Sequence, residues 1–309
     1  MSKKIAVTGG AGFIGSHIVD LLIERGYDVA VIDDLSTGKK ENLNPKARFY
    51  EVNMCDPYLR EVLGKEGPDA VIHLAAQVSV KNSIANPRFD ARTNIIGSIS
   101  LFESCKDLCI EKVVYASSVG IYGEPQYLPV DEKHPIQPTS PYAASKYAVE
   151  NYLHYYKRNH NIKYTTLRYS NVYGPRQDPA GESGVIAIFI NKLMRKEKAT
   201  INGDGGQTRD FVYVGDAAKA TLFALEKDGK NGAYNIGTGS EISVGQLYAD
   251  LKKLFASDLF PIYGNPINGE IRNMRMSPVL ARSELGWAPE VSLDVGLKKT
   301  IDWFKTKVR

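Results

Sequence analysis

The chain has 309 residues, of which 43% are hydrophobic and 24% are charged, and these are the proportions of an ordinary globular protein. A chain of this length can bury one or two substantial cores, and its composition excludes extensive disorder. The net charge of +4 is small, and the basic residues form only short pairs such as Lys39-Lys40 and Lys298-Lys299. We therefore expect no nucleic-acid partner.

The three cysteines cannot all pair within one chain, and Cys105 and Cys109 lie one helical turn apart without the spacing of a zinc module. This cysteine usage favours a reducing compartment and predicts no metal site. No apolar run approaches the length of a membrane span, and residues 1–4 lead into the first strand without a signal-peptide core. We expect a cytoplasmic protein that does not bind membranes.

An apolar run, a glycine-rich turn and a helical run follow one another at the start of the chain. Ile5-Ala6-Val7 leads into Thr8-Gly9-Gly10-Ala11-Gly12-Phe13-Ile14-Gly15, and residues 16–25 have a helical pattern. A strand, a tight turn and a helix N-terminus in this order expose backbone N–H groups and a positive dipole end to a pyrophosphate. The glycine spacing alone is weak evidence, but in this context it predicts a dinucleotide-binding site.

The second apolar run, residues 29–32, ends at Asp33, which lies 18 residues beyond Gly15. A carboxylate at this strand end can accept hydrogen bonds from the adenosine ribose. It would also repel the 2′-phosphate of NADP, so the sequence favours NAD. The alternative is that Asp33 only caps the loop that follows it.

Strand-like and helical segments then alternate through the first half of the chain. Nearly continuous apolar runs rich in β-branched residues predict strands at 4–7, 29–32, 48–52, 70–74, 112–117 and 164–168. Helical patterns occupy residues 13–25, 58–63, 89–108 and 142–160. Such strands are typical of a parallel sheet that is covered on both faces. We therefore expect an α/β fold, with a doubly wound Rossmann sheet that forms an NAD-binding domain over residues 1–169.

The pattern changes beyond about Tyr169, with Gly- and Pro-rich segments and shorter elements near 185–195, 243–254 and 293–304. This change predicts a smaller mixed α/β domain over residues 170–309 that binds the substrate, with some segments returning to the first domain. The substrate would lie in the crevice outside the carboxyl ends of the first-domain strands.

Tyr142 and Lys146 stand at positions i and i+4 on one face of a predicted helix, and Pro141 suits its first turn. A tyrosine with a reference pKa of roughly 10 stays protonated at neutral pH, whereas a lysine cation and the positive nicotinamide ring of NAD favour the phenolate. Tyr142 is therefore a candidate general base beside a hydride acceptor.

The Tyr-x-x-x-Lys spacing alone discriminates poorly, because Tyr248 and Lys252 repeat it in a second helical segment. We predict that this second copy lies on the surface. The first copy is accompanied by Ser118, which follows a predicted strand at the edge where a cofactor would bind and could relay the proton of the reacting hydroxyl. The alternative is that Ser118 is a turn residue and Tyr142 an interfacial aromatic.

These motifs together resemble the extended short-chain dehydrogenase/reductase superfamily, and within it the nucleotide-sugar 4-epimerases typified by UDP-glucose (UDP-galactose) 4-epimerase. The resemblance spans nearly the whole chain. It runs through segments 8–15, 73–77, 117–118, 142–146, 167–176, 203–211 and 285–287, together with Asn94.

The resemblance implies an NAD site, a UDP-sugar site and a catalytic set. In it, Asp33 would hold the ribose, Asp56 would meet the adenine and Lys146 would hydrogen-bond the nicotinamide ribose. The implied NAD-binding residues are Gly9, Gly12, Phe13, Ile14, Gly15, Asp33, Asp34, Asp56, Leu74, Ala75, Ala76, Asn94, Tyr142, Lys146 and Tyr169. The implied substrate-binding residues are Ser118, Tyr142, Asn171, Val185, Arg209 and Glu270. The implied catalytic residues are Ser118, Tyr142 and Lys146.

Arg209 matches a position that binds the diphosphate in this family, and its planar guanidinium suits phosphate oxygens. The alternative is a surface ion pair with a neighbour such as Asp210.

The residues after Ser118 also discriminate among reactions. The related 4,6-dehydratases have an Asp-Glu pair directly after the serine or threonine, because eliminating water across C5 and C6 needs an additional acid and base. This chain has Val119-Gly120 there, which favours epimerisation through a transient 4-keto sugar. The alternatives are a related enzyme, such as a UDP-uronic acid 4-epimerase, an epimerase for another nucleotide's sugars or a nucleotide-sugar reductase, and a non-catalytic NAD-binding scaffold.

Several positions on the sugar-nucleotide side depart from the family pattern. Ile267 stands where an arginine usually binds the phosphates, and Asn202 stands where an aromatic residue usually packs near the uracil. Arg272 could replace the missing charge from nearby. Ser277 replaces a common aspartate, and Val78 stands where some epimerases have a lysine near the cofactor. These departures leave the preferred sugar and nucleotide open.

Met274 matches the position whose bulk limits the C2 substituent of the sugar in this family. A flexible thioether can yield where a tyrosine ring could not. We therefore predict that N-acetylated UDP-hexoses are accepted as well as plain ones.

Family resemblance also implies a homodimer in which the helices at 89–108 and 142–160 pair into a four-helix bundle. The apolar side chains available for this contact are Ile95, Ile99, Phe102, Tyr147, Val149 and Tyr152. The same side chains could instead cover the sheet.

Overall fold

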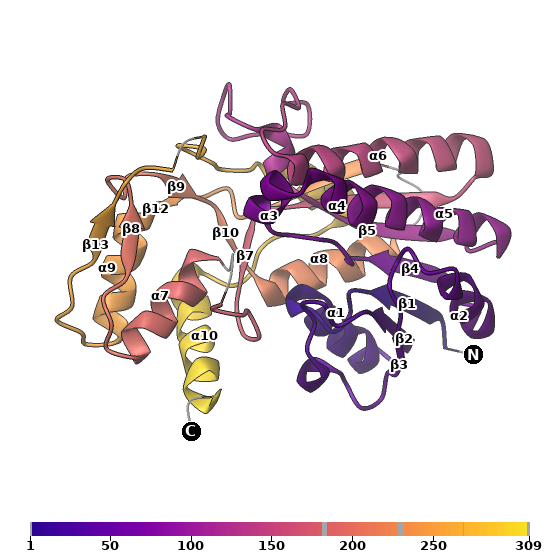
Figure 1. The fold of residues 1–309 in the computed structure, drawn as a ribbon, viewed down its shortest axis with the longest axis horizontal. Helices are drawn as coiled ribbons and strands as arrows, with labels where there is room; N and C mark the ends of the chain where they lie inside the picture. The colour runs from indigo at the N-terminus through magenta and orange to yellow at the C-terminus, as the bar shows by residue number, and fades with distance from the viewer. Residues whose placement is uncertain (1, 181–183, 228–231, 268, 308–309) are drawn as a thin grey trace.

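The computed structural model describes residues 2–180, 184–227, 232–267 and 269–307. A seven-stranded sheet in the order β11-β6-β5-β4-β1-β2-β3 forms its main body, and helices lie on both faces (Figure 1). All neighbouring strands of this sheet are parallel. The predicted doubly wound α/β fold is therefore confirmed.

The elements of this body follow the sequence pattern closely. The strands are β1 Lys4–Thr8, β2 Asp28–Asp33, β3 Arg48–Glu51, β4 Ala70–His73, β5 Lys112–Ser118, β6 Lys163–Tyr169 and β11 Gly232–Ile236. The α-helices up to residue 169 are α1 Phe13–Glu24, α2 Tyr58–Glu66, α3 Val80–Ala85, α4 Pro87–Ala91, α5 Gly97–Asp107 and α6 Pro141–His160. Short helical segments are η1 Lys40–Asn42, the π-helical η2 Arg92–Ile96 and η3 Val119–Tyr122.

Alternate residues of each strand bury against opposite layers of helices. Ile5 and Val7 of β1 belong to a core with side chains of α1, whereas Ala6 between them belongs to a core with side chains of α2, α5 and α6. Both faces of the sheet are thus buried, which explains why its strands are nearly continuous apolar runs.

Two elements from beyond residue 169 complete the sheet and its cover. Strand β11 pairs in parallel with β6, so that Ile236 lies opposite Tyr169. Helix α8, Val214–Glu226, packs beside α1 and contributes Ala220 and Leu222 to the same core. The sheet therefore takes its edge strand from the second half of the chain.

The other elements of the second half gather on one side of the sheet (Figure 1). Its strands pair as β7 Asn171–Tyr173 with β10 Phe211–Tyr213, β8 Thr200–Asn202 with β13 Ile262–Gly264, and β9 Thr208–Arg209 with β12 Ile242–Ser243. The exception is the π-helical segment η4 Ala281–Leu285, which packs on α8 and β11 of the main body. The helices of this group are α7 Val185–Met194, α9 Val244–Leu254 and α10 Leu293–Lys307. These elements share a separate hydrophobic core, which includes Ile190, Leu247 and Leu297.

The prediction that Tyr248 lies on the surface is wrong. Tyr248 is buried in this second core, where its ring meets Phe189 edge-on and its hydroxyl donates to the carbonyl of Leu259 over 3.2 Å. The reason is that Tyr248 shares the apolar face of α9 with Leu247 and Leu251.

Candidate active site

The glycine-rich turn packs so closely on the sheet that two of its positions accept only glycine. Gly9 has a φ of +71°, and a Cβ there would lie 2.7 Å from the backbone nitrogen of Ala75. A Cβ on Gly15 would lie 2.1 Å from the carbonyl oxygen of Gly9. Helix α1 is therefore held tightly against the turn, and the turn meets the segment that follows β4.

The N-terminus of α1 suits an anion. Gly12 caps the helix without a side-chain hydrogen bond, and the first helical turn, which begins with Phe13 and Ile14, has no acidic residue. The positive end of the helix dipole suits the negative charge of a pyrophosphate, and the small residues of the turn leave space for it. These residues fit the phosphate portion of NAD.

Asp33 ends β2 beside the glycine turn and is buried. Its carboxylate accepts hydrogen bonds from the backbone N–H groups of Ala11, over 3.0 Å, and Leu35, over 2.9 Å. Burial raises the pKa of Asp33, and these two hydrogen bonds oppose that shift. The carboxylate therefore organises its own loop, as the capping alternative expected, and it does so next to the turn where a dinucleotide would lie.

Asn94 links the segment after β4, which includes Leu74, Ala75 and Ala76, to helix α6. Its side chain accepts from the N–H of Gln77 over 2.7 Å and donates to the carbonyl of Gln77 over 3.0 Å and to Ser145 over 3.0 Å. The π-helical segment that carries Asn94 is of a kind found often at functional sites.

Three further predicted cofactor residues have partners within the protein. Asp34 accepts hydrogen bonds from Ser36, and Asp56 accepts one from the backbone at the start of α2. The hydroxyl of Tyr169 lies 2.5 Å from that of Thr221, inside the core between β6 and α8. The roles of these residues toward NAD remain predictions.

Ser118, Tyr142 and Lys146 come together where β5 ends and α6 begins. Ser140 caps α6 with a hydrogen bond from a backbone N–H, which puts Tyr142 in the first helical turn. The Ser118 hydroxyl lies beside the Tyr142 side chain, close enough to favour its phenolate form. Lys146 Nζ donates to the carbonyl of Ala116 over 2.8 Å and lies 6.0 Å from the centre of the Tyr142 ring.

Burial dominates the proton affinities of this cluster. It raises the pKa of Tyr142, and the Ser118 hydroxyl opposes the rise. It lowers the pKa of Lys146 to about 8, against the attraction of the Asp90 and Glu150 carboxylates. Tyr142 is thus protonated at neutral pH in the protein alone, and a further positive charge beside its ring would favour the phenolate.

Arg209 and Glu270, both predicted to bind the substrate, form an ion pair. Arg209 Nη2 lies 2.8 Å from Glu270 Oε1, and Nη1 donates to the carbonyl of Thr208 over 2.7 Å. Burial lowers the pKa of Arg209, and the carboxylate of Glu270 opposes this shift. The alternative pair with Asp210 is not formed, because the buried Asp210 carboxylate accepts hydrogen bonds from Thr238 and other backbone N–H groups.

The other residues predicted to bind the substrate or its phosphates lie on separate elements. Asn171 begins β7, and Val185 begins α7. Arg272 forms a two-point ion pair with Asp204, over 2.7 and 2.8 Å, so its charge is already engaged on an exposed loop. A hollow of about 440 Å³ borders Arg209. Its other lining residues are Phe211 and residues of the 238–242 and 289–293 segments. Ser118, Tyr142 and Lys146 do not line it.

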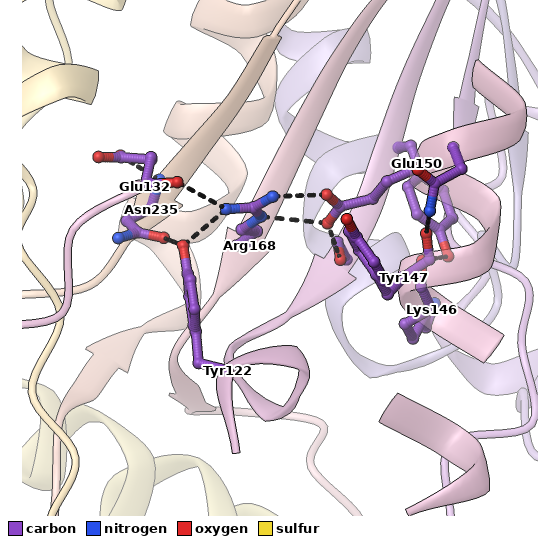
Figure 2. Close-up of polar contacts among 10 residues, drawn as sticks. Tyr122, Glu132, Lys146, Tyr147, Glu150, Arg168 and Asn235 are labelled. Atoms are coloured by element: carbon purple, nitrogen blue, oxygen red, sulfur yellow. Dashed lines mark hydrogen bonds and ion pairs between the residues drawn. The ribbon is translucent and has the colours of Figure 1, made fainter. Parts of the chain in front are cut away.

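The sequence alone did not predict a buried ion pair that lies next to the cluster of Ser118, Tyr142 and Lys146. Glu150 of α6 and Arg168 of β6 lie 2.7 Å apart, with 8% and 6% of their side chains exposed. Figure 2 shows the pair between Lys146 and Tyr122. The available signal was that Glu150 stands four residues after Lys146, on the same face of the helix.

A family model described as the NAD-dependent epimerase/dehydratase family matches residues 5–237 of the chain. The chain belongs to this family. NAD is therefore its cofactor, as the glycine-rich turn and Asp33 predicted, and the extended short-chain dehydrogenase/reductase resemblance is confirmed.

Relatives and solved structures narrow the family further. A putative UDP-glucose 4-epimerase of Methanocaldococcus jannaschii is 51% identical over 306 residues, which are 99% of each chain. The crystal structure of UDP-glucose 4-epimerase from Thermotoga maritima with UDP-glucose has a TM-score of 0.97 at 47% identity and covers 99% of this chain and 100% of that chain. The UDP-N-acetylglucosamine 4-epimerase from Methanobrevibacter ruminantium, in complex with UDP-N-acetylmuramic acid, has a TM-score of 0.95 at 37% identity and covers 99% of each chain. The chain is thus an enzyme that is UDP-glucose 4-epimerase-like.

Among the described residues, no helix combines the length and the apolar character that crossing a membrane requires. The His, Cys, Asp and Glu side chains of the same residues form no group of three or more that could hold a metal ion.

The close packing at Gly15 yields a test of the NAD site. Gly15→Ala should abolish NAD binding, because its Cβ would lie 2.1 Å from the Gly9 carbonyl and push the turn out of place. Gly64→Ala is the control, since a Cβ at this helical position makes only an ordinary 3.5 Å contact. NAD content after purification and NAD titration of both variants measure the effect. Wild-type NAD affinity in Gly15→Ala would contradict the assignment.

Proposed function

We propose that this enzyme interconverts the C4 epimers of a UDP-hexose, UDP-glucose and UDP-galactose, through a transient 4-keto sugar. The observation that carries the proposal is the cluster of Ser118, Tyr142 and Lys146 at the edge of the sheet that bears the glycine-rich turn. The similarity to proteins named UDP-glucose 4-epimerase supports the choice of substrate.

Each member of the cluster has a distinct task in this proposal. Tyr142 takes the proton of the C4 hydroxyl, directly or through Ser118, and returns it to the epimer. Lys146, held by the carbonyl of Ala116, supplies positive charge near the Tyr142 ring. When bound at the glycine-rich turn, NAD supplies the acceptor and donor for the C4 hydrogen. The net redox change is zero.

The residues after Ser118 support epimerisation over elimination. Val119 and Ile121 turn into an apolar cluster with Val130 and Met276. A dehydratase needs an acid and a base at the 119 and 120 positions, and Val119-Gly120 offers neither. The 4-keto sugar is therefore expected to be reduced again at C4.

Arg209 is the residue that we expect to bind the diphosphate. Its guanidinium is fixed by Glu270 and by the Thr208 carbonyl, and an arginine has more N–H donors than these two contacts use. A prearranged guanidinium loses little side-chain entropy on binding phosphate. Asn171 and Val185 are proposed to complete this subsite.

Tyr142→Phe tests the catalytic assignment. The variant should bind NAD normally but lose turnover by about 10²–10⁴-fold, because the base is missing while the ring remains. Tyr248→Phe is a matched control, since Tyr248 has the same spacing to a lysine and lies in the second core. Interconversion of UDP-glucose and UDP-galactose is the assay. Near-normal turnover in Tyr142→Phe would remove this residue from the mechanism.

We further propose that the enzyme accepts the N-acetylated UDP-hexoses. Met274, at the position expected to limit the C2 substituent, is buried with Ile121, Tyr122 and Met276 in a cluster beside the turn after Ser118. Its flexible thioether can repack around an acetamido group. The similarity to a UDP-N-acetylglucosamine 4-epimerase supports this extension.

Substrate breadth can be measured with one pair of sugars. We expect kcat/KM values for UDP-N-acetylglucosamine and UDP-glucose that agree within about tenfold, because repacking a methionine costs little. Refusal of the acetamido sugar alongside ready conversion of UDP-glucose would contradict the proposal.

We also propose a homodimer formed through α6 and the helical run of α4, η2 and α5. Phe102 and Val149, two of the side chains predicted for the contact, instead lie in the core against the sheet. Exposed apolar side chains do occur on these elements, at Phe89, Ile96 and Tyr152. They support a pairing of the same helices through Tyr152, which was predicted for the contact, and through Phe89 and Ile96, which were not.

Light scattering on the purified protein tests this assembly. We expect a mass of about twice that of the chain, and Ile96→Glu together with Tyr152→Glu should shift it toward the monomer, because charged groups in a dimer contact would be desolvated. A monomeric wild-type protein would contradict the proposal.

A further inference from the structure

Three residues on successive turns of α6 contact three successive residues of β5. Tyr142 lies beside the hydroxyl of Ser118, Lys146 donates to the carbonyl of Ala116, and Glu150 accepts from the hydroxyl of Ser117 over 2.6 Å. The proposed mechanism uses the first two contacts. The third has no assigned role.

Glu150 joins α6 to two strands at once. Its Oε1 accepts from Ser117 of β5 and, over 3.2 Å, from Nε of Arg168 on β6, while its Oε2 accepts from Arg168 Nη2 over 2.7 Å. Ser117 and Arg168 lie directly opposite each other in the sheet. The carboxylate of Glu150 therefore contacts β5 at the residue just before Ser118. Glu150 itself stands one turn after Lys146 on α6.

Arg168 extends the hydrogen-bond network from Glu150 to Tyr122. Its Nη1 donates to the hydroxyl of Tyr122 over 2.8 Å, and that hydroxyl donates to Asn235 over 2.7 Å (Figure 2). Asn235 in turn donates to the side chain of Glu132 and to the carbonyl of Val130. Tyr122 ends η3, the turn that begins after Ser118. The network thus connects the helix of the base to the turn of the serine.

We propose that Glu150 and Arg168 are positioning residues that hold Tyr142 and Lys146 in register with Ser118. The inference rests on the proposed function for its catalytic consequence. Neither residue touches the reacting groups in this assignment, and both act through Lys146 and Ser118.

Glu150 also stands four residues after Lys146 on one face of α6, so its position can be followed through the charges around Lys146. Asp90 on α4 and Glu150 on α6 both favour the ammonium form. Tyr115 of β5 lies with its ring centre 5.0 Å from Lys146 Nζ, and Tyr142 lies on the same helix face. His73 of β4 is neutral, because burial lowers its pKa to about 3. Removing the charge of Glu150 leaves Asp90 as the one carboxylate in this set.

Glu150→Gln removes the charge and keeps the shape, and Glu66→Gln is its matched control. Glu66 also has 8% of its side chain exposed and also lies 2.7 Å from an arginine, Arg48, but this pair joins α2 to β3 away from the cluster. Both variants remove one buried carboxylate charge, but Arg48 is 42% exposed and keeps Asp28 as a partner, whereas Arg168 stays buried without its ion-pair partner. Thermal unfolding of each variant therefore measures its structural cost separately.

The first readout is the titration of Lys146, followed by NMR of ¹³Cε-labelled lysine and assigned by the signal missing from Lys146→Met. In Glu150→Gln the titration midpoint should fall by about one pH unit, because a neighbouring negative charge has been lost. In Glu66→Gln it should not move. This readout does not depend on any substrate.

The second readout is epimerisation kinetics. Glu150→Gln should lower kcat by on the order of tenfold or more with little change in KM, because the base and the serine are misplaced. The alkaline limb of its kcat profile should move to lower pH, since Lys146 loses its proton earlier. If Glu150→Gln does not fold, Glu150→Gln with Arg168→Met replaces it, since removing both charges leaves no lone buried ion.

A wild-type Lys146 midpoint and wild-type kcat in the Glu150 variant would overturn the inference, and so would equal changes in Glu66→Gln. An inactive wild-type protein on every UDP-hexose would overturn the proposed function instead. In that case the titration of Lys146 still decides whether Glu150 stabilises the charged form of Lys146.

Discussion

The active-site geometry depends on how helix α6 is attached to the end of strand β5. Apolar side chains such as Val149 and Leu153 bury the helix against the sheet, but apolar contacts are not directional. Register is set by the polar contacts of Tyr142, Lys146 and Glu150 with residues 116–118. Breaking a buried ion pair by removing one partner costs about 3–5 kcal/mol, so the arrangement is strongly determined.

The parallel sheet explains why this attachment lies next to a dinucleotide site. The glycine-rich turn follows β1, Asp33 ends β2, Ala75 follows β4 and Ser118 ends β5. Because all these strands run in one direction, their carboxyl ends share one edge of the sheet. Topology thus brings the proposed phosphate site and the proposed catalytic cluster together. Burial at this edge raises the pKa of Tyr142 and lowers the pKa of Lys146, because it disfavours the charged form of each group.

Local patterns in the sequence predicted the parts of the fold that depend on local chemistry. The strand, glycine turn and helix at residues 4–24 follow from backbone sterics, and the helix of Tyr142 follows from Pro141 and its cap. The pairing of β11 with β6 was not predictable in detail, because it joins residues far apart in the chain. The same is true of Glu150 and Arg168: each resembles a solvated charge in sequence, and they meet only because α6 packs over Ser117 and Arg168, which lie opposite each other in β5 and β6. Tyr248 was misplaced because one tyrosine spacing says nothing about which helix face is buried.

In the proposed reaction Tyr142 moves only the hydroxyl proton, while the hydrogen on C4 leaves and returns without exchange with water. Conversion of UDP-glucose that carries deuterium at C4, in ordinary water, tests this directly. The UDP-galactose formed should retain the deuterium at C4, because no side chain of the cluster exchanges that hydrogen with solvent. Loss of the deuterium to water would contradict it.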